Sequence, residues 1–321
     1  MFTRKMIAVL ILAVTIITGS VGGLAAQDTP IIRVGSKNFE ESILLGHLIM
    51  VMLEENGFAV EDLTNTGNTL TVRRALLSGQ LDLYAEYTGT AYSNLFANVE
   101  NFTFDEATIR NNYFTYSKVA ALDAAYNDVI WLTPAPANNT NAIVIRQDFA
   151  EANDLNTMSD FAAFINNGGD VFLVGSETFV SRPDALPAFE AVYDFELADS
   201  QILVIAGASS TTTEQAVSEN VNGINAGMGF STDATIEVSD LILLEDDRGA
   251  MPVFQPTPTI RGEVLRQFPQ ISLLLHPVFQ SLDTEQLIAL NSGVQVEGRP
   301  YHEVATEYLT ENGFIGDEAG E

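Results

Sequence analysis

The stretches IIRVGSKNF (residues 31–39) and LDLYAEYTGT (residues 81–90) decide the fold class. Each begins with an apolar run of strand length, residues 31–34 and 81–85, and passes directly into a short polar loop. In open α/β sheets, ligands are held by loops at the carboxyl ends of the strands. These two loops supply a cation, an aromatic ring and hydroxyls, without a nucleophile–base pair or a metal cluster. They therefore predict that a small molecule is bound rather than chemically converted.

Strand and helix patterns alternate along most of the chain, which predicts an α/β protein with mostly parallel sheets flanked by helices. Residues 40–56 carry apolar side chains at helical spacing, with two acids in the first turn, where the helix dipole favours them. The further expected strands are 59–63, 129–132, 142–145, 171–175, 201–205 and 224–229. The further expected helices are 69–78, 105–126, 185–193, 212–219, 261–268, 270–280, 284–290 and 300–312.

Two proline-containing stretches, residues 133–139 and 251–258, interrupt this alternation and predict extended connectors between two α/β sets. With 321 residues, of which 46% are hydrophobic, the chain is long enough for two domains. We expect one lobe from residues 27–138 together with 251–321, a second lobe from residues 139–250, and a ligand in the cleft between them. After residue 258 we expect helices only.

The N-terminus has the pattern of a secretory signal peptide over residues 1–26. Arg4 and Lys5 form a basic start, residues 6–17 are apolar, and small residues at 23–26 suit cleavage. The apolar run is short for a membrane span, although an uncleaved anchor is the alternative. We expect an exported protein, either periplasmic or held at the cell surface by a retained signal.

The chain has no cysteine and a formal charge of −29. The absence of cysteine excludes disulfides, thiolate metal sites and thiol catalysis. The acidic surface argues against nucleic acid as a partner and weakly favours cationic ligands. An alternative reason for the charge is solubility in a salty or acidic habitat.

Three candidate ligand-binding residues lie in the two loops: Lys37, Tyr87 and Thr90. Lys37 follows the first strand at the opening of a helix, where a cation opposes the dipole and is therefore placed to meet an anion. The Tyr87 ring suits a cation, and Thr90 suits an anion at a helix N-terminus. The alternatives are a surface lysine, a strand-end tyrosine with a satisfied hydroxyl, and a threonine cap.

Five further candidates follow later in the chain: Asn139, Asn141, Arg182, Phe230 and Phe254. The two amides stand where the chain enters the second lobe, either lining the cleft or forming a polar hinge turn. The guanidinium follows a strand and suits a carboxylate; its alternative is an ion pair within its own lobe, with Glu177 or Asp184. Each phenylalanine taken alone fits the core better than a binding cage.

Other charged residues carry no predicted chemistry. The acid pairs Glu40-Glu41 and Asp246-Asp247 are interpreted as solvated faces or helix starts, and the three histidines share no metal-ligand spacing. Phosphate-loop, dinucleotide, calcium-loop and Gly-x-Ser-x-Gly motifs are absent from the sequence. We therefore expect neither a cofactor nor a metal.

Across nearly all of residues 27–321, the chain resembles the substrate-binding proteins of ABC importers for glycine betaine, choline, carnitine and related osmoprotectants. The similarity is carried by GSKNF at 35–39 and LYAEYTGTAY at 83–92, which are specific. Weaker segments occur in the same order: NNT at 138–140, STD at 231–233, LEDD at 244–247 and VATEYL at 304–309.

The resemblance implies a two-lobed type II periplasmic-binding-protein fold that closes on a quaternary ammonium inside an aromatic cage. Tyr87 matches one cage wall, while Phe230, Phe254 and Asn141 stand where the family has tyrosines. A phenylalanine keeps a π-face, whereas Asn141 offers an amide that suits a hydroxyl or an N–H.

Three other matches concern the polar part of the cage. Lys37, Thr90 and Arg182 match positions that meet a betaine carboxylate, which favours a zwitterion over choline. Asn139 matches a polar position in the cage floor.

The function expected from this resemblance is delivery of a quaternary ammonium or related compatible solute to an ABC permease and its cytoplasmic ATPase. The protein is then a monomer that performs no chemistry on its ligand. The alternative is an exported enzyme or a sensor on the same fold that acts on a small zwitterionic amine.

Overall fold

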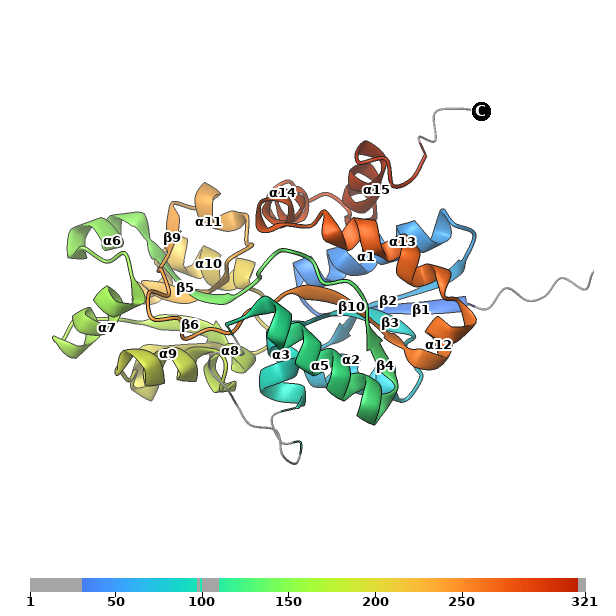
Figure 1. Ribbon diagram of the computed structural model, residues 1–321. Coiled ribbons are helices and arrows are strands. Elements are labelled where there is room, and N and C mark those ends of the chain that lie inside the picture. Colours follow the sequence, from blue (N-terminus) through green and yellow to red (C-terminus); the bar gives the residue numbers. More distant parts are fainter. Residues whose placement is uncertain (1–30, 97–98, 100–109, 317–321) are drawn as a thin grey trace, which may run out of the picture. The chain divides into compact units, whose positions relative to one another are not determined.

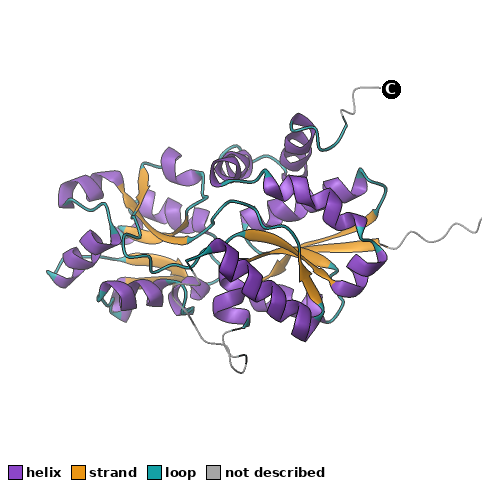
Figure 2. Ribbon diagram, in the orientation of Figure 1, coloured by secondary structure: helices purple, strands orange, loops and turns teal. Residues whose placement is uncertain are grey.

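The computed structural model describes residues 31–96, 99 and 110–316. The predicted signal peptide, residues 1–26, lies outside the described residues, as does the first part of the helix expected at 105–126. The described chain contains two five-stranded sheets, each flanked by helices (Figure 2).

The strands divide between the two sheets by position in the sequence (Figure 1). Sheet 1 has the order β2-β1-β3-β10-β4 and is formed by β1 (Ile31–Lys37), β2 (Ala59–Gly67), β3 (Leu83–Tyr87), β4 (Val129–Trp131) and β10 (Pro256–Arg261). Sheet 2 has the order β7-β6-β8-β5-β9 and is formed by β5 (Asn141–Arg146), β6 (Leu173–Ser176), β7 (Ile202–Ile205), β8 (Ala226–Phe230) and β9 (Leu241–Leu243). The chain thus leaves sheet 1 after β4 and returns to it at β10.

Both sheets are mixed. In sheet 1, β1 runs parallel to β2 and β3, and β10 runs antiparallel to β3 and β4. In sheet 2, β6 runs parallel to β7 and β8, and β5 runs antiparallel to β8 and β9. The predicted two-sheet α/β class is confirmed, with the antiparallel strands placed where the chain crosses between the sheets.

The expectation that only helices follow residue 258 was wrong, because β10 is a central strand of sheet 1. Its prolines argue against a strand in the sequence, because proline has no N–H group to donate a hydrogen bond to a neighbouring strand. The carbonyl groups of Pro256 and Pro258 point toward the segment that follows β4, where they accept hydrogen bonds from Ala135 and Leu132. The N–H groups that the two prolines lack would face that same segment. Thr257 and Thr259, which alternate with the prolines, pair with β3 on the other side. The three-residue strand β9 was also not predicted.

Nine helical segments accompany sheet 1 in the described chain: α1 (Glu40–Glu54), α2 (Thr69–Leu77), α3 (Thr88–Thr90), the π-helical η1 (Ala91–Leu95), α5 (Asn112–Asn127), α12 (Gly262–Gln267), α13 (Gln270–Gln280), α14 (Thr284–Gln295) and α15 (Tyr301–Glu311). The segments that accompany sheet 2 are α6 (Gln147–Asn153), α7 (Met158–Asn166), α8 (Glu177–Ser181), α9 (Leu186–Tyr193), α10 (Ser210–Ser218), α11 (Thr235–Val238) and two short 3₁₀ turns, η2 (Asp199–Gln201) and η3 (Val221–Gly223). No helix in the described part of the chain combines the length and apolarity needed to cross a bilayer.

Helix α1 is buried on almost every side. One face packs on β1 and β2, and α13, α14 and α15 cover the rest. Leu44, Leu48 and Leu53 are therefore completely inaccessible, and Met50 and Met52 are nearly so. Burying each such side chain contributes about 1.5–3 kcal/mol, so α1 is anchored firmly. Its first turn, which follows the loop 36–39, is consequently held in a fixed position.

A buried ion pair connects two helices on the other side of sheet 1. Arg73 of α2 forms a bidentate pair with Asp123 of α5, and both side chains are nearly inaccessible. Asp123 also accepts hydrogen bonds from the indole of Trp131 and the amide of Asn127. Removing one member of such a pair leaves an uncompensated buried charge.

We therefore expect Arg73→Met to lower the free energy of unfolding by about 3–5 kcal/mol, measured by urea denaturation. Arg266→Met is the matched control, because its bidentate partner Asp128 is solvent-exposed, and we expect an unchanged midpoint. Equal midpoints for the two variants would contradict this account of α2 and α5.

Candidate functional site

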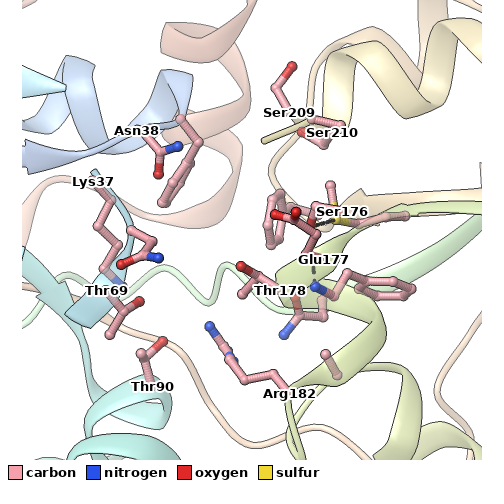
Figure 3. A pocket seen from close by; sticks show the side chains of 18 of the residues that line it. Lys37, Asn38, Thr69, Thr90, Ser176, Glu177, Thr178, Arg182, Ser209 and Ser210 are labelled. Atoms are coloured by element: carbon pink, nitrogen blue, oxygen red, sulfur yellow. Dashed lines mark hydrogen bonds between the residues drawn. The ribbon is translucent and has the colours of Figure 1, made fainter. Parts of the chain in front are cut away.

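All eight residues predicted to bind a ligand line one cavity of about 180 Å³. Topology explains why they meet. Strands β1, β3, β6 and β8 end at the cavity with Lys37, Tyr87, Ser176 and Phe230, and the antiparallel β5 begins there with Asn141. In Figure 3, Lys37, Thr69 and Thr90 lie on one side of the cavity, opposite Ser176, Glu177 and Thr178. The cavity therefore receives side chains from both sheets.

Three aromatic rings from three segments are in contact in this cavity. The ring of Phe39, directly before α1, lies 5.8 Å from that of Tyr87 and stacks on that of Phe230 at 5.7 Å between centroids. Phe39 lies between β1 of sheet 1 and α1, and Phe230 ends β8 of sheet 2, so this contact joins the two sides. Phe39 was quoted within the segment 36–39 but was not predicted as a site residue. Its position two residues after Lys37, in the same loop at a strand end, could have identified it from the sequence.

Phe254 forms another part of the wall and is 3% exposed. It packs against the backbone of Gly89, where an added Cβ would lie 2.9 Å from the phenylalanine ring and 2.7 Å from the Val253 carbonyl oxygen. A glycine at position 89 is therefore required for this close approach. Thr90, one residue later, is buried within the wall. It ends α3 and is the N-cap residue of η1, although its side chain makes no capping hydrogen bond.

Lys37 is neither a surface lysine nor an unpaired anion receptor. Its ammonium group forms a buried ion pair with Glu86 and lies 4.6 Å from the centroid of the Tyr87 ring. Burial lowers its pKa, and the adjacent Glu86 carboxylate opposes that effect. Its backbone N–H donates to Ser42 at 3.0 Å, which orients the loop. The cation that the sequence assigned to a ligand carboxylate is thus already paired.

Arg182 adopts the alternative arrangement that the sequence left open. Its guanidinium donates two hydrogen bonds to Asp184, at 2.5 and 3.0 Å. Asp184 in turn accepts from the amide of Asn94 at 2.9 Å, and its backbone carbonyl accepts from the amide of Asn141 at 3.2 Å. Arg182 lines the cavity with a side chain that is 20% exposed. Its charge, like that of Lys37, is largely compensated within the protein.

Glu41 lies in the first turn of α1, as the helix-start interpretation predicted, but it is not solvated. It is 2% exposed, and its carboxylate accepts four hydrogen bonds from four segments. One oxygen accepts from the Tyr87 hydroxyl at 2.8 Å and the Asn139 amide at 2.6 Å. The other accepts from the Thr232 hydroxyl at 2.5 Å and the Asn291 amide at 2.9 Å. A carboxylate has about four acceptor positions, so its capacity is filled.

A second buried acidic group lies behind Phe230. Asp233 accepts from the Phe230 backbone at 2.7 Å and from Gln295 of α14 at 2.9 Å. Glu214 of α10 accepts a hydrogen bond from Thr235 and interacts with Asp233. Burial, followed by the charge of the neighbouring carboxylate, raises the pKa of Glu214 to about 9, and burial also raises the pKa of Asp233. The fold therefore favours a protonated form of this pair.

Comparison with known proteins defines the class of this one. Residues 30–311 match the family described as the substrate binding domain of ABC-type glycine betaine transport systems. The glycine betaine-binding protein YehZ of Escherichia coli (strain K12) is 40% identical over 301 residues, covering 92% of this chain and 97% of the relative. A glycine-betaine-binding protein of Pseudomonas aeruginosa is 29% identical over 302 residues, covering 92% and 91%. The solved structure of apo YehZ superposes with a TM-score of 0.66 over 88% of this chain and 99% of that one.

This chain belongs to the family of substrate-binding domains of ABC-type glycine betaine transport systems. Members of this family bind solutes and are not enzymes, which removes the enzyme alternative. Substrate-binding proteins of ABC importers are extracytoplasmic, so this protein works outside the cytoplasm.

The acidic pair behind Phe230 gives a prediction about pH. A carboxyl group with a raised pKa in the folded state binds a proton that the unfolded chain has already released. Its contribution to stability is therefore present at low pH and is lost as the pH rises toward 9. We expect the free energy of unfolding in urea to fall between about pH 5 and pH 9. Glu214→Gln, which cannot ionise, should flatten that slope, and an unchanged slope would contradict the assignment.

Proposed function

We propose that this protein captures a quaternary ammonium or related compatible solute, such as glycine betaine, carnitine or a choline-like compound. The observation that carries the proposal is the contact of Phe39 with both Tyr87 and Phe230 in one cavity. A cation over the face of an aromatic ring is attracted by about 0.5–2 kcal/mol per ring, depending on desolvation. The names of the relatives in E. coli and P. aeruginosa agree with this ligand class.

The eight predicted residues have two proposed roles. Tyr87, Phe230 and Phe254, together with Phe39, provide ring faces for the ammonium group. The polar side chains that line the same cavity contact the remainder of the ligand; they are Lys37, Thr90, Asn139, Asn141 and Arg182.

Delivery follows from closure of two lobes around the bound solute. The proposed lobes are residues 27–138 with 251–321, and residues 139–250. This division is supported by the sheets, because all strands of sheet 2 fall within 139–250. The hydrogen bonds that Glu41, in the first lobe, accepts from Asn139 and Thr232, both in the second lobe, would stabilise the closed arrangement.

The proposed partner is an ABC permease with its cytoplasmic ATPase, which the protein meets as a monomer. The proposed location is the periplasm or the cell surface, with residues 1–26 serving as a signal that is either cleaved or kept as a tether. The acidic chain, with a net charge of −29, repels nucleic acid.

Binding is tested by calorimetric titration with glycine betaine, carnitine and choline. We expect saturable binding of at least one of them, and Phe39→Ala should weaken it by about 2- to 30-fold, as loss of one ring face implies.

Phe58→Ala is the matched control for this titration. Phe58 also packs edge-on against another phenylalanine, Phe268, but it does not line the cavity. Its loss should leave the affinity unchanged. Failure of all three solutes to bind, or an equal loss of affinity in both variants, would overturn the proposed function.

A further inference from the structure

The loop after β8, residues 231–234, is held by a side chain from the other proposed lobe. Gln295 of α14 forms two hydrogen bonds with it. Its Nε2 donates to Asp233, and its Oε1 accepts from the backbone N–H of Ala234, both at 2.9 Å. Because the loop belongs to the proposed second lobe and α14 to the first, these bonds exist only while the two lobes lie against each other.

Carboxyl groups from both proposed lobes gather beside this loop. Glu214 of α10 is completely buried, and its Oε1 has no hydrogen-bond partner among the described residues. Asp233, also buried, interacts with Glu214, so a proton on the pair would supply the donor that Oε1 lacks. Glu40 of α1, in the first lobe, acts electrostatically on Glu214. Its position in the first turn of a helix favours its negative charge.

No cation compensates these acids within the described part of the chain, where neither Glu214 nor Asp233 forms an ion pair. Strands β6 and β8, which pack on α10, carry no charged side chain. The other elements around the pair carry four further acids, one histidine and one arginine: Glu41, His47 and Glu54 of α1, Glu237 of α11, Glu285 of α14 and Arg146 of β5. The arginine pairs with Asp148 instead.

Separation of the lobes would change the surroundings of this pair. Burial, followed by the charge of Asp233, raises the pKa of Glu214, and the charge of Glu40 adds to that effect. Opening would admit water and move Glu40 away, so the pair would release its proton at a lower pH. Loss of the Gln295 bond would act in the opposite direction on Asp233, but more weakly than burial. The closed form therefore keeps a proton that the open form has released.

We propose that closure of the lobes is coupled to proton uptake by Glu214 and Asp233, so that solute is bound more tightly at low pH and released as the pH rises. The inference rests on the proposed function, because closure around a solute is the step that the proton favours. Asp233 connects the pair to the cavity, since it accepts a hydrogen bond from the backbone of Phe230, whose ring lines that cavity.

The test is calorimetric titration at about pH 6, 7 and 8, in buffers of different ionisation enthalpy, which counts the protons taken up on binding. The ligand is whichever of glycine betaine, carnitine and choline binds most tightly, because none of them changes its charge in this range. We expect proton uptake and a Kd that rises roughly 10-fold from pH 6 to pH 8; a single proton limits the rise to about 100-fold.

A Kd that does not change with pH, without proton uptake, would overturn the inference and leave the proposed function intact. If none of the three solutes binds at any pH, the proposed function fails and this inference with it.

Three variants assign the effect to the acid pair and to the contact between the lobes. Glu214→Gln cannot ionise, so we expect neither proton uptake nor a pH-dependent Kd. Glu219→Gln is the matched control, because it makes the same change at the exposed C-cap of the same helix and should leave the pH dependence unchanged. Glu40→Gln removes the charge that faces the pair from the first lobe and should reduce the proton uptake.

Two outcomes would contradict this assignment. One is a Glu214→Gln variant that takes up protons like the unmodified protein, or a Glu219→Gln variant that loses the uptake. The other is an unchanged uptake in Glu40→Gln, which would show that the pair does not respond to the opposite lobe. Melting curves at each pH report the folding of every variant separately from its proton count.

Discussion

The carboxylate of Glu41 is the constraint on which the arrangement of the site depends. Burying an ionised carboxylate is costly unless it is hydrogen-bonded. Here the four donors come from β3, from the segment that crosses to sheet 2, from the loop after β8 and from α14. Any movement that separates these segments would leave a buried charge without partners. The same four bonds therefore position the Tyr87 ring, the Asn139 amide and the loop beside Phe230.

The charged groups that line the cavity are already compensated within the protein. Two cations line it, and each is paired with a carboxylate of the protein, Glu86 for Lys37 and Asp184 for Arg182. The pairs keep positive charge near the rings without leaving a free receptor for a ligand carboxylate. Lys37 lies close to the Tyr87 ring, so a ligand cation must share that aromatic surface with it.

The sequence was sufficient for the fold class and for the eight cavity residues. Strand ends are recognisable locally, and the carboxyl ends of strands in one sheet converge in space, so Lys37 and Tyr87 could be placed together. Arg182 was also recognisable as a strand-end guanidinium, but only the resemblance to a known family connected it with Phe230 and Phe254.

What the sequence could not provide are pairings between distant residues. Glu41 appeared to be a first-turn acid because nothing local reveals that its partners lie 46, 98, 191 and 250 positions away. The partners of Lys37 and Arg182 depend on side-chain geometry in the same way. Strand β10 was missed because its prolines disguise an internal strand of the sheet, whose missing donors face the segment that follows the edge strand β4. Helix α1 showed the expected apolar spacing, but its nearly complete burial depends on α13, α14 and α15.

The most direct test of the central claim is a crystal structure of the protein with choline bound. The account predicts that the ammonium nitrogen lies within about 6 Å of the ring centroids of Tyr87, Phe39 and Phe230. It also predicts that Glu41 keeps its four partners. An ammonium group bound away from these rings, or a cavity from which Glu41 has withdrawn, would contradict it.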